Sequence, residues 1–286
     1  MNKTKNIWIR KASGESELFN VSKLKKSLKK AGADNKTSEA IAHEIENSLY
    51  EGISTHKIYN IAFSLLKKRN LKNAMHYKLK QSLFELGPTG YPFEFLIGEI
   101  FKRRGFEVDV GKIIDGHCIT HEMDVIATNK TEQLLIECKY SKDQGKYVSI
   151  QVPLYVRSRV DDIIKKRAET PAYSKLTFSA GVVTNTRFSS DSIEYSKCNG
   201  IMLLGWDYPQ NNGLKEIMEK ENIYPITILE NLTRKQKEQL MNQGVVTCKQ
   251  LVLNINLLAD FTISKRKQIK LEQELDIFLN YNDSLF

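Results

Sequence analysis

His121–Ala127 (HEMDVIA) and Leu134–Tyr140 (LLIECKY) are the two stretches that decide the fold of the central part of this chain. Each contains a short apolar run, and Thr128-Asn129-Lys130, between the two runs, are residues common in turns. Apolar runs of this length, bounded by turn formers, predict two paired and buried β-strands. Because side chains alternate along a strand, we expect Glu137 and Lys139 on one face and Cys138 packed on the other.

The charged residues at the ends of these strands indicate phosphodiester chemistry. Asp124 and Glu137 offer hard carboxylate oxygens, which Mg²⁺ or Mn²⁺ prefers. Lys139 offers a cation that can steer or deprotonate a water molecule and offset charge on a phosphate. Asp124, followed after twelve residues by Glu137-Cys138-Lys139, resembles the motif of the PD-(D/E)xK nuclease superfamily. The resemblance implies that Asp124 and Glu137 bind the metal, although the bare motif also fits a solvated strand edge with charges of both signs.

A helix upstream of these strands supplies a third acidic candidate. Apolar residues recur with helical spacing between Phe93 and Phe101, which predicts an amphipathic helix that ends at Gly105. Glu94 lies on the border of the apolar stripe, roughly 90° from its centre, whereas Glu99 lies on the solvated side. A carboxylate that reaches a site at the sheet edge should come from the border, so Glu94 is the candidate and Glu99 is expected to be a surface charge.

Downstream of the lysine, Gln151 and Tyr155 are four residues apart, and Pro153 between them predicts that both lie in the first turns of a helix. The pair resembles the accessory motif that several branches of the superfamily place after the lysine. There the motif helps to hold the water or the phosphate, which makes Gln151 a further catalytic candidate. An ordinary polar helix start explains the pair equally well.

The order helix, three strands, helix, strand over residues 91–210 predicts an α/β sandwich. Residues 180–188 and 201–206 resemble the closing half of the Mrr-like branch of the superfamily. That branch contains DNA restriction endonucleases of the modification-dependent type, so the resemblance implies an endonuclease that acts on foreign or modified DNA.

The positive charge of the chain is unevenly placed. Residues 1–90 contain 17 Lys and Arg against 8 Asp and Glu, residues 91–210 contain 16 of each kind, and residues 211–286 contain 10 of each. The whole excess of positive charge therefore lies in residues 1–90 and not in residues 91–210, which contain the candidate catalytic residues. A polyphosphate ligand of the first segment accounts for it, and so do lysine-rich solvated helix faces.

The first segment is predicted to form a β-hairpin over residues 7–20, with a turn at Ser13-Gly14, and then four amphipathic helices. The residues expected to cap the first three helices are Asn20 or Ser22, Thr37, and Ser54 or Thr55. The segment from Gly87 to Gly90 (GPTG) ends the fourth helix.

The motifs Ile9–Lys23 (IRKASGESELFNVSK) and Gly52–Thr55 (GIST) resemble the opening and the second half of the ATP-cone, a regulatory nucleotide-binding domain of ribonucleotide reductases. The resemblance covers about residues 5–86 and implies a site for ATP or dATP. The implied ligand-binding residues are Lys11 and Lys23 for the phosphates, Glu17 and Asn20 for the base or sugar, and Thr55 to complete the pocket. Ala12 and Tyr59 depart from the family pattern, which leaves the choice between ATP and dATP open.

The last segment is predicted to be a small all-α module. Two short helices around Gly244 resemble helix-hairpin-helix or SAM-like modules, which grip the DNA backbone through main-chain amides and basic residues. Because the segment is not basic, a small helical interaction module fits equally well.

Composition narrows the class of protein. The chain of 286 residues has room for two or three domains, and it has no apolar run of the length that a membrane span needs. Its four cysteines form no CxxC pair, and the set His117, Cys118 and His121 lacks a fourth zinc ligand nearby. These features, with no apolar signal segment after Met1, lead us to expect a soluble, cytoplasmic protein without a membrane partner.

We therefore expect a multidomain chain with a mostly α ATP-cone over residues 1–90, an α/β PD-(D/E)xK nuclease core over residues 91–210 and an all-α module over residues 211–286. The expected function is a Mg²⁺-dependent DNA endonuclease that is regulated by ATP or dATP and forms homo-oligomers through the ATP-cone. A nucleotide-sensing DNA-binding regulator with an inactive nuclease fold is one alternative. A nuclease that acts on RNA or branched DNA is another.

Overall fold

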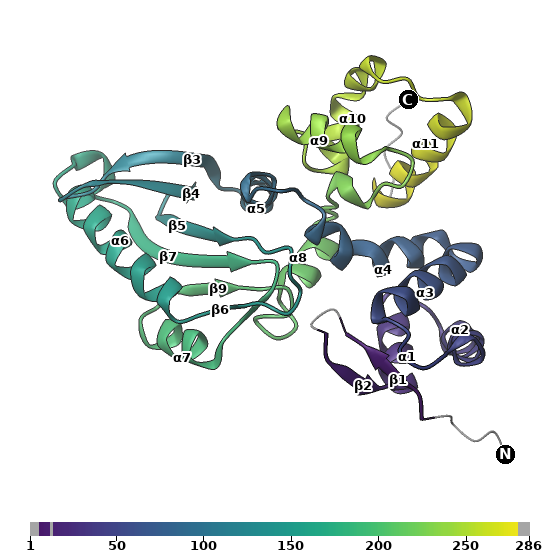
Figure 1. The fold of residues 1–286 in the computed structure, drawn as a ribbon. Helices are drawn as coiled ribbons and strands as arrows, with labels where there is room; N and C mark the ends of the chain where they lie inside the picture. The colour runs from purple at the N-terminus through teal and green to yellow at the C-terminus, as the bar shows by residue number, and fades with distance from the viewer. Residues whose placement is uncertain (1–5, 12–13, 280–286) are drawn as a thin grey trace. The chain divides into compact units, whose positions relative to one another are not determined.

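The computed structural model describes residues 6–11 and 14–279, and the chain divides into two compact units, residues 1–81 and 82–286 (Figure 1). A hairpin and helices build the first unit. A mixed sheet, covering helices and a C-terminal helical region build the second. At this level the expected fold class is confirmed. Among the described residues, no helix combines the length and apolar character that crossing a membrane requires.

The first unit begins with an antiparallel hairpin, and its predicted turn residue Ser13 lies outside the described residues. Leu28, Ile41 and Leu66 are fully buried in the core that the following helices share. The elements in chain order are β1 (Trp8–Arg10), β2 (Ser16–Leu18), α1 (Val21–Lys30), α2 (Asn35–Ser48), α3 (Thr55–Arg69) and α4 (Leu71–Phe84), the last of which continues into the second unit.

Side-chain caps fix where these helices begin. The Asn20 side chain accepts a hydrogen bond of 3.0 Å from the Lys23 N–H and caps α1, and Ser54 caps α3 in the same way. The expectation that Thr37 caps the second helix is wrong. Asp34 caps α2, and its carboxylate accepts a 2.6 Å hydrogen bond from the Thr37 N–H. Aspartate is a stronger N-cap than threonine, so the helix gains almost one turn.

The second unit is organised around a five-stranded sheet in the order β3-β4-β5-β7-β9. The first three strands form an antiparallel meander, whereas β5, β7 and β9 run parallel, so the sheet changes type at β5. The short strands β6 and β8 form a separate parallel pair. The strands are β3 (Glu107–Asp115), β4 (Thr120–Thr128), β5 (Glu132–Lys139), β6 (Tyr147–Val148), β7 (Thr177–Thr184), β8 (Arg187–Phe188) and β9 (Met202–Leu204).

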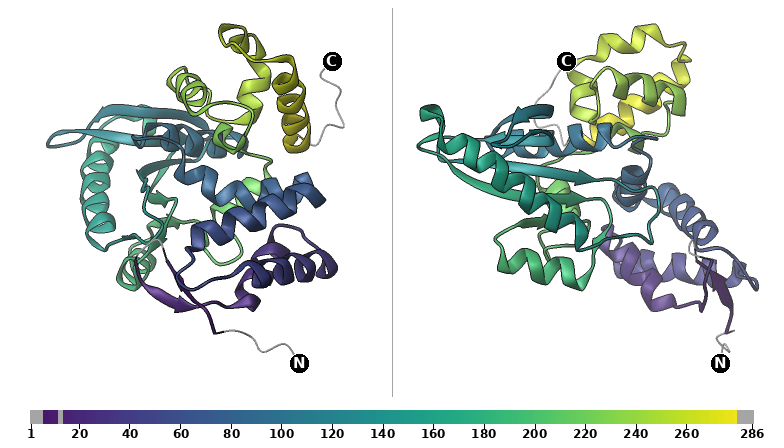
Figure 2. Two further views of the ribbon diagram at one scale, coloured as in Figure 1. Left: turned by 45° about the vertical axis from the view of Figure 1, so that its right-hand side comes forward. Right: turned by 60° about the vertical axis from the view of Figure 1, so that its left-hand side comes forward.

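Helices cover both faces of this sheet (Figures 1 and 2). On one face lies α5 (Tyr91–Arg103), whose Gly98 is so close to Val108 and Val110 of β3 that a Cβ there would contact both side chains. On the other face α6 (Gln151–Ala168) and α7 (Ser190–Cys198) pack on a buried cluster that contains Ile126, Leu135, Ala180 and Leu203. The short 3-10 helix η1 (Pro171–Tyr173) precedes β7.

The C-terminal helical region forms a small core of its own. Leu240, Val246 and Leu251 are fully or almost fully buried there, and the rings of Tyr224 and Phe278 lie 4.7 Å apart. The buried carboxylate of Glu274 accepts hydrogen bonds from the backbone N–H groups and the amide of the segment before α9. The elements are α8 (Leu214–Lys220), η2 (Ile226–Ile228), α9 (Arg234–Asn242), α10 (Cys248–Leu253), η3 (Ile255–Asp260) and α11 (Lys265–Leu279).

Candidate active site

Strands β4 and β5 separate at the position of the predicted acidic residues. Their ladder runs from Thr128–Gln133 to Val125–Ile136, so Asp124 and Glu137 would form the next pair. At that point the Asp124 Oδ2 atom accepts a 2.6 Å hydrogen bond from the backbone N–H of Cys138. A carboxylate therefore replaces a strand as the partner of this amide, and the separation of the strands opens space between the two acidic side chains.

The other side of β4 is also interrupted at Asp124. In the β3–β4 ladder Val110 pairs with Val125 and Lys112 pairs with Met123, and Gly111 between them has a φ of 61°. This left-handed conformation favours glycine, and it marks a local break in regular pairing opposite Asp124. Asp124 thus lies where both neighbouring ladders are broken.

Glu137 is almost fully buried and is oriented by three donors. Its Oε1 atom accepts hydrogen bonds of 2.6 Å from the Tyr155 hydroxyl and from Lys139 Nζ. Its Oε2 atom accepts a 2.6 Å hydrogen bond from Arg159 Nη1. Since a carboxylate oxygen has two acceptor positions, one position on Oε2 remains open. Charge-assisted hydrogen bonds of this kind hold the carboxylate in one orientation.

Lys139 is the half-exposed cation of this cluster. Burial by itself lowers its pKa, but the hydrogen bonds to Glu137 and Tyr155 outweigh burial, and the net result is a raised pKa. The ammonium group also lies 5.5 Å from the centre of the Tyr155 ring. Lys139 is therefore a fixed positive charge beside the separated strands at any physiological pH.

Glu94 and Asp124 carry the excess negative charge of the cluster. Burial, followed by the negative charge of Glu137, raises the pKa of Asp124 to about 6. Burial, followed by the charges of Asp124 and Glu122, raises the pKa of Glu94 to about 7. Near neutral pH these carboxylates repel one another in a half-buried setting, and a cation between them would relieve that repulsion.

The donors present fit a Mg²⁺ or Mn²⁺ ion, although His, Cys, Asp and Glu side chains form no group of three or more with metal-binding geometry in the described part of the chain. Mg²⁺ usually keeps several waters and takes only one or two carboxylates from the protein. Asp124 uses Oδ2 for the Cys138 amide and keeps Oδ1 for a ligand, and Glu137 keeps one position on Oε2. The raised pKa of Asp124 indicates that negative charge at this position lacks full compensation.

The remaining predicted catalytic residue is not part of the cluster. Gln151 is the exposed first residue of α6, and its side chain makes no hydrogen bond to any residue that the structure describes. Tyr155 and Arg159 follow at successive spacings of four on the same helix face and do reach Glu137. Glu99, expected to be a surface charge, is half-buried and pairs with Lys102 at 2.8 Å.

Sequence reasoning missed Arg159 and Glu122. Arg159 continues the four-residue spacing from Gln151 and Tyr155, and Glu122 is two residues before Asp124 on the same strand. Arg159 also donates a 3.1 Å hydrogen bond to the Glu122 carbonyl. One further step of the four-residue helical spacing leads to Arg159, and one further step of the two-residue strand alternation leads to Glu122, so both residues could have been identified from the sequence.

A second candidate site lies within the first unit. A cavity of about 330 Å³ lies between the end of β1 with the residue after it and the start of α3, and Arg10, Lys11, Thr55 and His56 are among its lining residues. The Arg10 N–H donates a 3.0 Å hydrogen bond to the Ile53 carbonyl and holds the two segments together. Lys11 and Thr55 were predicted for this site, whereas Arg10 and His56 were not, although each is adjacent in sequence to a predicted residue.

The other predicted nucleotide contacts form an ion cluster beside Lys11. Glu17 accepts from Lys11 Nζ at 3.2 Å and from Lys23 Nζ at 3.3 Å, so two cations share one carboxylate. The hydrogen bond to Glu17 raises the pKa of Lys11. Asn20 uses its side chain as the cap of α1. Lys11 Nζ also lies 3.6 Å from Glu15 Oε2, so the cluster contains two cations and two carboxylates, and its formal charges balance.

Comparison with known protein families finds a match in two separate parts of the chain. The family described as the ATP cone domain matches residues 7–80, so an ATP-cone domain is present. This domain supports a nucleotide ligand for the first unit. The family described as AF1548-like, C-terminal, matches residues 224–276.

Three individual proteins resemble larger parts of the chain. An uncharacterized protein of Archaeoglobus fulgidus is 31% identical over 156 residues, which make up 54% of this chain and 83% of the relative. The crystal structure of AF1548, a protein of unknown function, is 26% identical with a TM-score of 0.55 and covers 68% of this chain and 100% of its own. The MspJI restriction endonuclease, solved in complex with a 27-mer oligonucleotide, is 12% identical with a TM-score of 0.30 over 69% of this chain and 39% of its own.

Proposed function

The chain belongs to the AF1548-like family, and from this premise we propose that it is a Mg²⁺-dependent DNA endonuclease regulated by ATP or dATP. One observation carries the catalytic part of the proposal. The half-buried carboxylates of Asp124 and Glu94 lie beside Glu137 and the cation Lys139, at the point where β4 and β5 separate. This is the set of groups that the resemblance to the Mrr-like nucleases requires.

Asp124 and Glu137 are the proposed metal ligands, with Glu94 as a third carboxylate of the site. A bound Mg²⁺ would polarise the phosphodiester and lower the pKa of a water molecule. The clamp formed by Tyr155 and Arg159 keeps Glu137 oriented for this role. The hydrogen bond from Cys138 fixes the orientation of Asp124 in the same way.

The protonation states of Lys139 and Glu94 assign them different roles in the proposed reaction. The raised pKa of Lys139 keeps it charged, so it offsets negative charge on the phosphate and does not deprotonate water. Glu94, with a pKa of about 7, exchanges a proton readily at neutral pH and is the candidate proton acceptor.

Cleavage of supercoiled plasmid DNA tests this proposal. We expect wild-type protein to nick or linearise the plasmid with Mg²⁺ or Mn²⁺ and to be inactive in EDTA. Asp124→Ala should abolish cleavage, while Asp109→Ala, which changes an exposed aspartate of neighbouring β3, should cleave as wild type does. A folded Asp124→Ala protein that cleaves at the wild-type rate would show that the site is misassigned.

A DNA-binding regulator with an inactive nuclease fold is the second candidate. Glu137 favours it, because donors of the chain itself occupy three of its four acceptor positions. In that case the protein would bind DNA and nucleotide but leave plasmid, RNA and branched DNA intact under every metal condition. Cleavage of RNA or branched DNA alone would keep the chemistry and change the substrate class.

The ATP-cone provides the proposed regulation. We propose that bound ATP or dATP changes the cleavage rate through homo-oligomer formation, because the two sites lie in separate compact units of the chain. Sedimentation velocity of the full chain with and without each nucleotide tests this step. An unchanged sedimentation coefficient together with a changed cleavage rate would exclude assembly as the route.

A further inference from the structure

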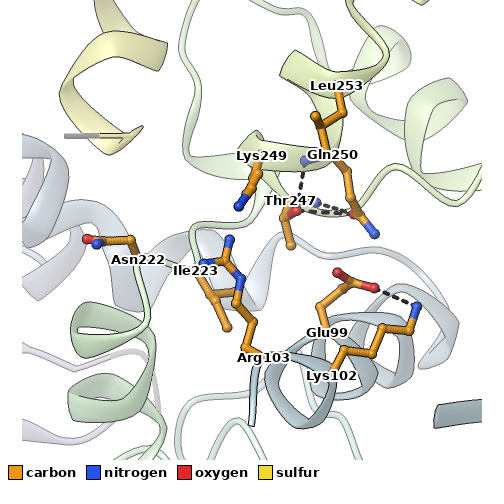
Figure 3. Close-up of a pocket in the computed structure, with 9 residues that line it drawn as sticks. All are labelled: Glu99, Lys102, Arg103, Asn222, Ile223, Thr247, Lys249, Gln250 and Leu253. Atoms are coloured by element: carbon orange, nitrogen blue, oxygen red, sulfur yellow. Dashed lines mark hydrogen bonds and ion pairs between the residues drawn. The ribbon is translucent and has the colours of Figure 1, made fainter. Parts of the chain in front are cut away.

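A cavity of about 260 Å³ lies within the second unit, between the end of α5 and the C-terminal module, residues 224–276 (Figure 3). Three sequence segments form its walls, and one of them is Asn222-Ile223, which follows α8. Lys102 and Arg103 come from the last turn of α5, and Lys249 and Gln250 come from α10. The cavity takes no part in the candidate active site, whose carboxylates lie at the other end of α5 and on the sheet.

The lining presents hydrogen-bond donors. The Oε1 atom of Gln250 accepts from the N–H groups of Val246 and Thr247, both at 2.9 Å, and from the Thr247 hydroxyl at 3.2 Å. These donors fix which end of the amide faces them, so the Nε2 end points away from Thr247 and toward α5 (Figure 3). Among the described residues that nitrogen has no hydrogen-bond acceptor, so both of its N–H groups can donate to a ligand.

Two cations approach the cavity from opposite walls, on the other side of Thr247 from the Gln250 amide nitrogen in the view of Figure 3. Figure 3 shows the side chains of Arg103 and Lys249 directed toward one another. Arg103 Nη1 donates a 3.1 Å hydrogen bond to the Glu221 carbonyl, which orients the guanidinium. The carboxylate in the lining, Glu99, is paired with Lys102. An anion between Arg103 and Lys249 would interact favourably with both positive charges.

We propose that this cavity binds a phosphate group of a nucleic-acid backbone, and that the C-terminal module thereby helps to hold the substrate. The assignment rests on the proposed nuclease function for its choice of a polymer. Glu94 and Arg103 are nine residues apart on α5, about 14 Å along the helix axis, or about four base-pair steps of duplex DNA. A polyphosphate chain can contact both ends of this helix, whereas one free phosphate can contact only one.

Two glutamines in equivalent positions give a matched test. Gln250→Glu keeps a side-chain oxygen for the Thr247 capping box but replaces the donating nitrogen of the cavity with a second carboxylate oxygen. Gln236→Glu makes the same change in the capping box of Thr233 on α9, away from the cavity. Lys249→Glu, compared with Lys235→Glu on exposed α9 surface, repeats the test with charge reversal.

The measurement is fluorescence anisotropy of a labelled DNA duplex with full-length protein in EDTA, over a range of salt concentrations. We expect Gln250→Glu and Lys249→Glu to weaken binding about tenfold or more, with a smaller salt dependence, while both control variants bind as wild type does. Equal affinities for each variant and its control would overturn the proposal. A second result would also overturn the proposal. In it, inorganic phosphate raises the melting temperature of wild type but not of Gln250→Glu, while both proteins bind DNA equally well. The cavity would then bind a free anion and not the nucleic-acid backbone.

Cleavage assays on the same proteins separate this proposal from the proposed function. Suppose that Gln250→Glu loses affinity for DNA, that Gln236→Glu does not, and that wild type cleaves no substrate. The phosphate site is then supported and the nuclease assignment is wrong. If wild type cleaves and the pair binds DNA equally, the nuclease assignment stands and the phosphate site falls.

Discussion

Replacing Asp124 by asparagine should stabilise the metal-free protein, because the site holds charge that the fold does not fully compensate. The pKa of Asp124 is raised from 3.8 to about 6. An acid with a raised folded-state pKa is most stable when protonated, so its ionisation lowers stability as pH rises from about 4 to about 6. At 1.36 kcal/mol for each pKa unit, this amounts to about 3 kcal/mol at pH 8, which solvent screening reduces to about 2 kcal/mol.

The substitution also weakens one interaction. A neutral amide oxygen accepts the Cys138 N–H less strongly than a carboxylate does, by about 1 kcal/mol. The net gain is then about 1 kcal/mol at pH 8, which raises the melting temperature of a unit of this size by about 2–4 °C. At pH 5 about half of the electrostatic cost is present in wild type, so the gain should nearly vanish.

Thermal unfolding followed by circular dichroism in EDTA at pH 5 and pH 8 measures this effect. Asp109→Asn, at an exposed aspartate of β3, is the control and should leave both melting temperatures unchanged. Adding Mg²⁺ or Mn²⁺ at pH 8 should stabilise wild type and not Asp124→Asn. The reasoning is refuted if Asp124→Asn is less stable than wild type at pH 8, or if both proteins gain equally from the metal.

Three further outcomes follow from the contacts described. Arg159→Ala removes one donor from buried Glu137, so it should lower the free energy of unfolding, measured with urea, by about 2 kcal/mol and abolish most of the cleavage activity. The control Arg157→Ala loses a partly exposed pair with an aspartate and should lower the free energy of unfolding by less than about 1 kcal/mol. The double variant Lys11→Ala, Lys23→Ala should bind ATP and dATP at least about tenfold more weakly in calorimetric titration, and its helicity should not change because neither lysine is buried. An unchanged affinity would show that neither lysine belongs to the nucleotide site. Glu274→Ala leaves three donors without their acceptor and should destabilise the C-terminal region by about 2–4 kcal/mol, so a wild-type denaturation midpoint would contradict this role.

Structural features that depend on residues close together in the sequence could be predicted from the sequence. The apolar spacing of α5 was predicted, and so was the pairing of the strands that contain Asp124 and Glu137. The length of β3, which runs as far as Asp115, was not readable in this way. Beyond Gly111 the strand loses its apolar alternation because its side chains there are mostly exposed, and hairpin pairing with β4 extends it nonetheless.

Features that depend on tertiary contacts were not readable. Nothing local marks Arg159 as a partner of Glu137, since 22 residues and a change of element separate them. The raised pKa values of Glu94 and Asp124 likewise arise from burial among elements that meet only in the folded protein. The residue types of the site could therefore be predicted, whereas the clamp that orients them required the structure.

The hydrogen bond from Cys138 to Asp124 has a consequence for the motions of the sheet. On its other edge β5 stays paired with β7 as far as Lys139–Thr184, and the Thr184 hydroxyl donates a 2.7 Å hydrogen bond to the Lys139 carbonyl. The end of β5 is thus held by backbone on one side and by a single titratable carboxylate on the other. Exchange of the Cys138 amide hydrogen with solvent deuterium should therefore follow the charge and occupancy of Asp124, which makes this one amide a reporter of the site that needs no substrate.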